Sequence, residues 1–167
     1  MTSTLKVDKI AHSGGTTGMT IDSSGRVLTP ARPTLFADMY NGSSAAYDTI
    51  ANLAIVPFRN KISGTGITLN EGVFTVPVDG FYQINATVFN NNDEDIELAL
   101  TVNGTDSTDI VLRAFRDEHR FVQLHMALPL SASDACRILN YSGANRGFHR
   151  NTNANDRYTA LSVYLIG

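Results

Sequence analysis

Short runs of alternating apolar and polar residues fill the chain from residue 50 onward, and Gly, Asn, Asp and Pro bound them. A period of two residues is typical of a β-strand, whose successive side chains point to opposite faces. One such run, residues 81–89, therefore places on one face Tyr82, Ile84, Ala86 and Val88. Helical periodicity is nearly absent, with only a weak candidate at residues 44–53. The pattern predicts an all-β chain.

The alternating runs and the turns between them predict about nine strands. A first hairpin is predicted at Asp79-Gly80, after a run whose apolar face holds Phe74, Val76 and Val78. A second is predicted at Asn103-Gly104, because Asn-Gly between two alternating runs is the strongest short hairpin signal. The predicted strands are 33–38, 53–58, 73–78, 81–90, 96–102, 108–115, 120–130, 135–141 and 158–166. Strands at such close spacing are typical of a sandwich or barrel.

Residues 1–30 have a different character, since they are rich in Ser, Thr and Gly. They hold two short alternating stretches, 5–7 and 19–21, and a turn at 23–25. So short a segment cannot bury a core, and it becomes stable only when it pairs with copies of itself or with another protein. Pro30 and Pro33 mark the start of the main domain. The sequence thus predicts an extended N-terminal segment, 1–30, and a domain, 31–167.

Length and composition agree with one compact domain and a modest appendage. The chain has 167 residues, of which 43% are hydrophobic, enough for a sizeable core. The net charge of -3 and the scattered Lys and Arg residues give no attraction to phosphate backbones, so nucleic acid is not an expected partner. No apolar run has the length of a signal peptide or of a membrane span. We expect synthesis in a cytoplasm and no membrane insertion.

The phase of the strands turns several large aromatic residues away from the predicted core. They are Phe81, Phe89, Phe115 and Phe121, together with Tyr141 if Ile138 points inward. A monomer would expose them, whereas burial between subunits would contribute on the order of a few kcal/mol each. These five residues are therefore candidates for a trimer interface. The alternative is a register that is wrong by one residue in some strands, which would turn them inward.

The acidic loop at 90–95 is the weak candidate for a metal site. Its carboxylates, Asp93, Glu94 and Asp95, follow three Asn residues, and calcium prefers such oxygen ligands. The loop lacks the Gly and the spacing of a helix-loop-helix calcium site, so a solvated loop is the favoured interpretation. No cofactor is expected otherwise.

No other constellation indicates catalysis, and we expect no enzymatic activity. His119 and His125 share a strand face but lie about 20 Å apart, too far to bind one metal. Known nucleophile, phosphate-loop and zinc-protease motifs are absent from the sequence. Cys136, the single cysteine, cannot form a disulfide within the chain, and burial in the core is its expected role.

Four segments are predicted as exposed loops, at 41–49, 90–95, 103–108 and 142–157. The last loop contains the candidate binding residues Arg146, His149, Arg150 and Arg157. Cationic side chains among Asn and Gly suit contacts with acidic or glycan surfaces. The plain alternative is a solvated loop without a ligand.

The order of these motifs resembles the jelly rolls of complement globular heads and tumour-necrosis-factor-like proteins. Residues 31–37 resemble their opening strand and 55–58 their second strand. The most specific match is 72–82, a strand, a Pro-x-x-Gly turn and an aromatic pair. Matches to later strands follow in order at 98–104, 124–136 and 159–167. The resemblance implies a homotrimer, a jelly-roll sandwich of about ten strands, termini together at the base and loops at the apex.

The leading stretches 3–10 and 18–27 are similar to the start of small structural proteins of marine bacteriophages, where they precede a jelly-roll knob. No collagen repeat precedes the domain, so the resemblance does not extend to mammalian complement or adipokine roles. It implies a virion structural protein, a fibre or knob on the head or tail. Residues 1–30 would attach it to a capsid or tail protein, and 31–167 would bind a host cell-surface glycan or protein at the virion surface. Capsid decoration without receptor binding and a free-standing binding module are the alternatives.

Overall fold

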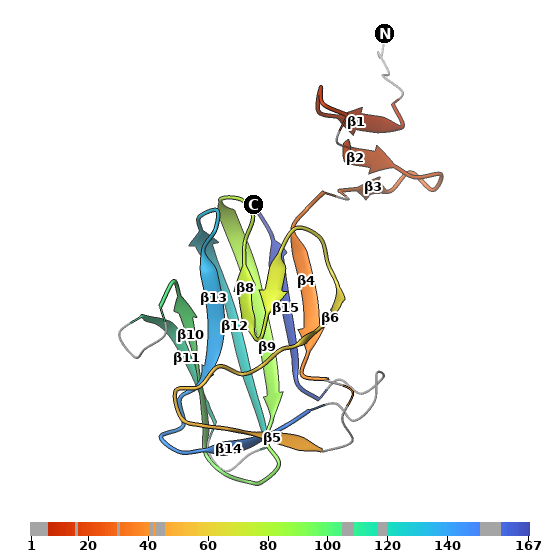
Figure 1. Ribbon diagram of the computed structural model, residues 1–167. Helices are drawn as coiled ribbons and strands as arrows, with labels where there is room; N and C mark the ends of the chain where they lie inside the picture. Colours follow the sequence, from red (N-terminus) through yellow and green to blue (C-terminus); the bar gives the residue numbers. More distant parts are fainter. Residues whose placement is uncertain are drawn as a thin grey trace.

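The computed structural model describes residues 7–15, 17–29, 31–40, 42, 46–104, 109–116, 120–150 and 158–167. Within these ranges the chain forms fifteen β-strands and no helix (Figure 1), which confirms the all-β prediction. The weak helix candidate at 44–53 is wrong, because Tyr47–Ile50 forms strand β5. The described residues thus include no helix that could cross a membrane.

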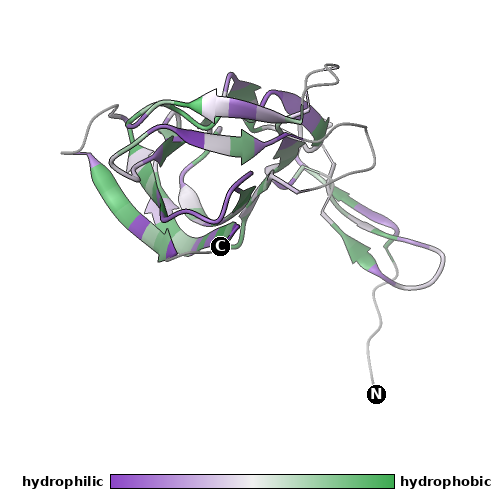
Figure 2. Ribbon diagram, turned by 90° about the horizontal axis from the view of Figure 1, so that it is seen from below, coloured by the Kyte–Doolittle hydropathy of each residue, from purple (hydrophilic) through white to green (hydrophobic). Residues whose placement is uncertain are grey.

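Ten strands form two five-stranded sheets, in agreement with the predicted jelly roll. The first, here the β9 sheet, has the order β12 (Phe121–Leu130), β9 (Gly80–Phe89), β15 (Ala160–Leu165), β4 (Thr34–Asp38) and β6 (Asn60–Ser63). The second, the β10 sheet, has the order β11 (Ile110–Arg116), β10 (Ile96–Val102), β13 (Ala135–Asn140), β8 (Val73–Thr75) and β7 (Thr68–Asn70). Figure 2 shows the same body from below.

The core fills the space between the two sheets. The alternating residues of β9, from Tyr82 to Val88, are fully buried, and Leu98 and Leu100 of β10 lie opposite in the same core. Each large apolar side chain buried in this way stabilises the fold by about 1.5–3 kcal/mol. The hydroxyl of Tyr82 donates to Val78 O at 2.9 Å, so its polar tip is satisfied. The predicted inward face of β9 is therefore confirmed.

Of the two predicted hairpins, one is wrong and one is confirmed. Asp79-Gly80 is not a hairpin turn, because β8 and β9 belong to different sheets and the chain crosses between them. Val78 lies on this crossover after β8 has ended, and 43% of it is exposed instead of buried. The hairpin at Asn103-Gly104 is confirmed, since β10 and β11 pair antiparallel and Asn103 adopts a φ of 58°.

The predicted strand at 53–58 forms no regular strand. Leu53 has a φ of 64°, and Ile55 makes only an isolated bridge to Leu139. Pro57 has no backbone N–H with which to continue a ladder. The edge strands β6 and β7 were not predicted, because each is only three or four residues long and largely polar.

A two-stranded sheet closes one end of the sandwich, the apex (Figure 1). It pairs β5 with β14 (Arg146–His149), so part of the predicted loop 142–157 is a strand. Asp48 of β5 lies 2.8 Å from Arg59 and 3.2 Å from Arg150, which ties the sheet to the body. Burial by itself would lower the pKa of Arg59, but hydrogen bonds and charges from Glu71 and Asp48 outweigh it and raise that pKa.

The chain enters and ends at the opposite end, the base. Leu165 N donates to Pro33 O at 3.0 Å, and Phe81 N donates to Gly167 O at 2.7 Å. Both termini of the domain therefore lie together, as the resemblance implied. A separate antiparallel sheet projects from this end (Figure 1), formed by β1 (Lys9–Ala11), β2 (Thr17–Ile21) and β3 (Val27–Leu28). Within the described ranges it pairs with no strand of the sandwich.

We expect Asn140→Ala to lower the free energy of unfolding by about 2–3 kcal/mol, since buried carbonyls would lose their donor. The buried Asn140 amide donates to Ile50 O at 2.8 Å and to Ala144 O at 2.9 Å, which joins β13 to the apex. Chemical denaturation measures the change. The control Asn70→Ala, at an exposed position of β7, should change stability by less than about 0.5 kcal/mol. Equal effects of the two variants would contradict the assignment.

Candidate interaction surface

The side of the β9 sheet that faces away from the core is the candidate functional surface, here termed the outer face. Cross-strand partners share a face, and the register pairs Phe121 with Phe89, His125 with Asn85, and Asn85 with Ser162. Aromatic residues lie toward its two ends, with a polar centre between them. Its members on β12, β9 and β15 include Phe81, Gln83, Asn85, Phe89, Phe121, Gln123, His125, Ser162 and Tyr164.

Four rings gather at the apical end of the outer face. The ring centroid of Phe89 lies 4.5 Å from that of Phe121, 5.4 Å from His149 and 5.6 Å from Tyr158. Tilted and edge-on ring pairs of this kind contribute about 0.5–1.5 kcal/mol each beyond area burial. Phe89 is half-buried by these contacts, whereas 48% of Phe121 is exposed on top of the cluster. The cluster thus ends in an uncovered aromatic surface.

A hydrogen-bond network occupies the centre of the outer face. Asn85 Oδ1 accepts from Gln83 Nε2 at 2.9 Å and lies 3.0 Å from His125 Nδ1. Asn85 Nδ2 in turn donates to Ser162 Oγ at 3.3 Å. Because an amide oxygen only accepts, the His125 contact requires the ring proton on Nδ1. The network connects three neighbouring strands and holds these polar groups in fixed positions.

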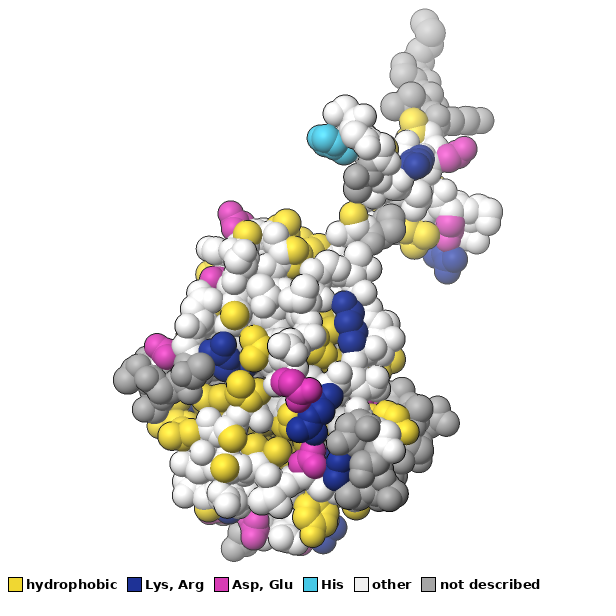
Figure 3. Space-filling view, in the orientation of Figure 1, with side chains coloured by type: hydrophobic (Ala, Val, Ile, Leu, Met, Phe, Trp, Pro, Cys, Tyr) yellow, Lys and Arg dark blue, Asp and Glu magenta, His cyan; other side chains and the backbone are white. Residues whose placement is uncertain are grey.

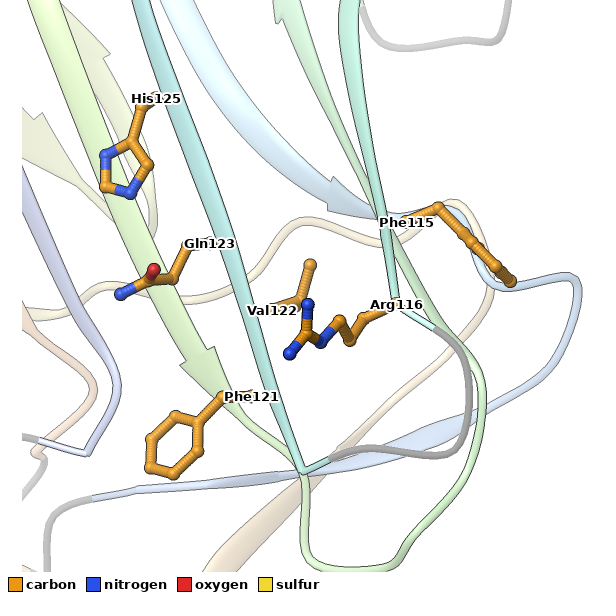
Figure 4. Close-up of a pocket in the computed structure, with 6 residues that line it drawn as sticks. All are labelled: Phe115, Arg116, Phe121, Val122, Gln123 and His125. Carbon is orange, nitrogen blue, oxygen red and sulfur yellow. The ribbon is translucent and has the colours of Figure 1, made fainter.

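A depression of about 300 Å³ lies where the edge strands β11 and β12 of the two sheets meet (Figure 4). Phe121, Gln123 and His125 project in a row from β12, and Arg116 of β11 extends its guanidinium toward them. The remaining lining residues are Phe115 and Val122. This mixture of apolar side chains with Arg116, Gln123 and His125 suits a side chain of a protein partner, since aromatic residues and Arg are enriched at interfaces.

The five predicted interface aromatics do not share one face. Phe81 and Phe121 lie on the outer face, 51% and 48% exposed, whereas Phe115 belongs to β11 of the β10 sheet and is 62% exposed. Tyr141 follows β13 of that same sheet, and the guanidinium of Arg113 is 4.2 Å from its ring centroid. The outward register is confirmed for the three exposed residues. The sequence did not reveal which sheet each strand would join, and a trimer interface through these five residues stays a prediction.

The cationic residues predicted on an exposed loop are mostly engaged in the fold. Arg150 is buried, with 7% exposed, and binds Asp48, so its predicted exposure is wrong. Arg146 donates to Asp95 O at 2.7 Å, and His149 belongs to the aromatic cluster. Pairing of β14 with β5 causes this difference, and the sequence pattern gave no sign of it. Arg157 and His119 lie outside the described residues.

The acidic loop pairs with arginines. Asp93 Oδ1 accepts from Arg120 Nε at 3.0 Å, and Glu94 lies 3.8 Å from Arg146. Exposed pairs of this kind contribute about 0–1 kcal/mol. Among the residues that the structure describes, no three His, Cys, Asp or Glu side chains gather as metal ligands. Calcium binding by Asp93, Glu94 and Asp95 therefore stays an untested prediction.

Comparison with known proteins identifies a fold but no sequence family. No protein-family model matches the chain, and no curated protein is similar to it in sequence. Eiger TNF of S. frugiperda superposes with a TM-score of 0.66 at 12% identity, over 82% of this chain and 94% of that one. Murine APRIL gives 0.61 at 13% identity, over 81% and 99%. The globular domain of zebrafish complement 1qA gives 0.57 at 19% identity, over 81% and 98%. The chain therefore has the jelly-roll fold of these proteins.

We expect Cys136 to stay unreactive toward thiol reagents until the protein unfolds. Burial, reinforced by the nearby charge of Asp134, raises the pKa of its thiol to about 12. At pH 8 the native thiol should react at least about a hundredfold more slowly than a cysteine at an exposed strand position, because only the thiolate attacks. Thr68→Cys on β7 supplies that reference. Equal rates of colour release from a disulfide reagent would contradict the prediction.

Proposed function

We propose that this chain is a trimeric binding knob on the surface of a bacteriophage particle. The observation that carries the proposal is the uncovered aromatic surface of the outer face, where Phe81, Phe121 and Tyr164 are 51%, 48% and 39% exposed. Exposed aromatic residues that flank a polar centre are typical of protein–protein interfaces, where aromatic side chains are enriched. Self-association removes this surface from water without requiring another protein.

A trimer suits the arrangement of the outer face and the depression beside it. The depression lies at the β12 border of the outer face, so the outer face of one chain can pack against the β11 edge of the next, which bears Phe115 and Arg116. Head-to-tail contacts of this kind close into a ring when the rotation permits. The jelly-roll fold and the resemblance to trimeric families support a ring of three.

The N-terminal segment supports the particle role. Residues 3–10 and 18–27 resemble the start of phage structural proteins, and the β1–β3 sheet lies at the base, opposite the β5–β14 apex (Figure 1). In the proposed orientation, residues 1–30 contact a capsid or tail protein and the apex points outward toward a host glycan or surface protein. The protein is made in the host cytoplasm and ends on the virion. Many weak sites on one particle would then act together.

Capsid decoration without a receptor is a second candidate, and one observation favours it. Arg146 and Arg150, the cations expected to meet a ligand, are held by Asp95 and Asp48 within the chain. A free-standing module is less well supported, because that function predicts a dispensable and disordered N-terminus, whereas β1–β3 form a sheet. Neither alternative includes an enzymatic activity.

We expect Phe121→Asp to dissociate the trimer, because an aspartate in the interface would be buried without a partner. Light scattering of the full chain measures the native mass, which should fall from three chains to one. Thr68→Asp is the matched control, since Thr68 is exposed on β7, at the edge of the β10 sheet opposite β11. The interface assignment is wrong if Phe121→Asp keeps the mass of the parent, and a monomeric parent would refute the trimer itself.

Electron microscopy of particles that carry the protein tests the location. Density on a tail or head fibre, together with inhibition of host adsorption by the purified chain, would support the knob. Density spread over the capsid, without inhibition, would favour decoration. Absence of the chain from purified particles would contradict both functions.

A further inference from the structure

The N-terminal sheet has one apolar face. Its register pairs Ile10 with Met19 and Ile21 with Val27. Paired residues share a face, and so do residues two apart in one strand, so these four side chains lie together. They are termed the apolar face below. The opposite face carries Lys9, Thr20 and Leu28, which are paired in the same way.

A single chain leaves the apolar face uncovered. Ile10, Ile21 and Val27 are 52%, 37% and 58% exposed. In Figure 3 the sheet stands clear of the jelly-roll body, with hydrophobic side chains on its surface. Small sheets of this kind need a packed face to be stable on their own. Some other surface therefore has to cover these residues.

The strands themselves are held in place by a locally encoded turn. Asp22 Oδ1 accepts from Ser24 N at 2.9 Å and from Arg26 N at 3.0 Å, and Asp22 Oδ2 lies 2.7 Å from Arg26 Nε. Gly25 supplies the positive φ, 76°, that the turn requires. Hydrogen bonds from Arg26, first from its backbone and then from its side chain, lower the pKa of Asp22. The turn can thus form in each chain before the apolar face is covered.

A short connection keeps the sheet close to the outer face. Residues 29–33 join β3 to β4, and this tether spans at most about 20 Å even when fully extended. Its far end is fixed at the base, where Leu165 N donates to Pro33 O at 3.0 Å. Tyr164 of the outer face pairs with Thr34, the residue after Pro33, and Phe81 of the outer face accepts at its carbonyl oxygen from Ile166 N. A trimer built through the outer face therefore gathers three N-terminal sheets at one end.

The formal charges of the N-terminal sheet balance, so electrostatic repulsion does not oppose contact between copies of it. Residues 7–29 carry Asp8, Lys9, Asp22 and Arg26, whose formal charges cancel. Asp22 and Arg26 are also paired with each other. Symmetry brings identical groups together, which would cause repulsion in a segment of one charge sign. This balance favours a second and third copy as the occupant over a strongly charged partner.

We infer that the apolar faces of three chains pack against one another and form a stalk on the same axis as the knob. The inference rests on the proposed trimer and specifies its base. Residues 9–28 contribute to assembly in addition to any contact with a particle. The surface offered to a capsid or tail protein is then the outside and the tip of the stalk.

Cysteine pairing in the full-length chain tests the stalk. Ile21→Cys puts a thiol on the apolar face, and Thr20→Cys puts one on the opposite face of the same strand. With dissolved oxygen as the oxidant, which takes up the two electrons and two protons of each thiol pair, we expect Ile21→Cys chains to form disulfide-linked dimers at least about tenfold faster than Thr20→Cys chains. The rate should be independent of protein concentration, because pairing within a trimer is intramolecular. Val27→Cys on β3 should behave like Ile21→Cys. Denaturing gels run without reductant measure the pairing, and light scattering verifies each native mass.

The outcomes separate the stalk from the trimer. A trimer in which neither Ile21→Cys nor Val27→Cys pairs would overturn the stalk and leave the knob intact, as expected if a particle protein covers the face. Equal pairing rates for Thr20→Cys and Ile21→Cys would also overturn it, since they would indicate chance collisions. A monomeric mass for the unmodified chain would remove the trimer and, with it, the stalk.

Discussion

The alternation of side chains along β9 is the constraint on which the rest of the structure depends. Tyr82 and Ile84 point into the core, so Gln83 and Asn85 must point out of it. Because β9 lies between β12 and β15, its outward residues meet those of both neighbours. Packing of the two sheets therefore also creates the outer face. A shift of the β9 register by one residue would bury Gln83 and Asn85 of the hydrogen-bond network and expose Tyr82 and Ile84 of the core.

The two ends of the sandwich are closed by different interactions. At the apex, Asp48 bridges Arg59 and Arg150, so an ion-pair network holds the β5–β14 sheet to the body. At the base, backbone hydrogen bonds fix the two termini of the domain to the β9 sheet. The base can carry the N-terminal sheet because the chain enters there. The proposed function assigns attachment to the base and recognition to the apex.

The knob and the stalk of the proposed assembly use the two faces of a β-sheet in the same way. In the knob, the β9 sheet buries one face in the core of the chain and offers its outer face to the neighbouring chain. In the stalk, the N-terminal sheet buries its apolar face among the three chains and offers its opposite face to a capsid or tail protein. The outer face presents Phe81 and Phe121, and the apolar face presents Ile21 and Val27. Each surface is small by itself. Threefold repetition on a common axis would make both contacts part of one cooperative assembly.

Much of the fold was predictable from sequence because strand periodicity and turn chemistry are local. Alternation gave the inward residues of β9 and β10, and Asn103-Gly104 gave the hairpin between β10 and β11. The exposure of Phe81, Phe115 and Phe121 also followed from strand phase. Tertiary structure alone decided the sheet partners, since pairing joins residues far apart in the chain. That pairing separated β8 from β9, placed Phe115 and Tyr141 on a different sheet from Phe81 and Phe121, and drew Arg150 from a predicted loop into a buried ion pair.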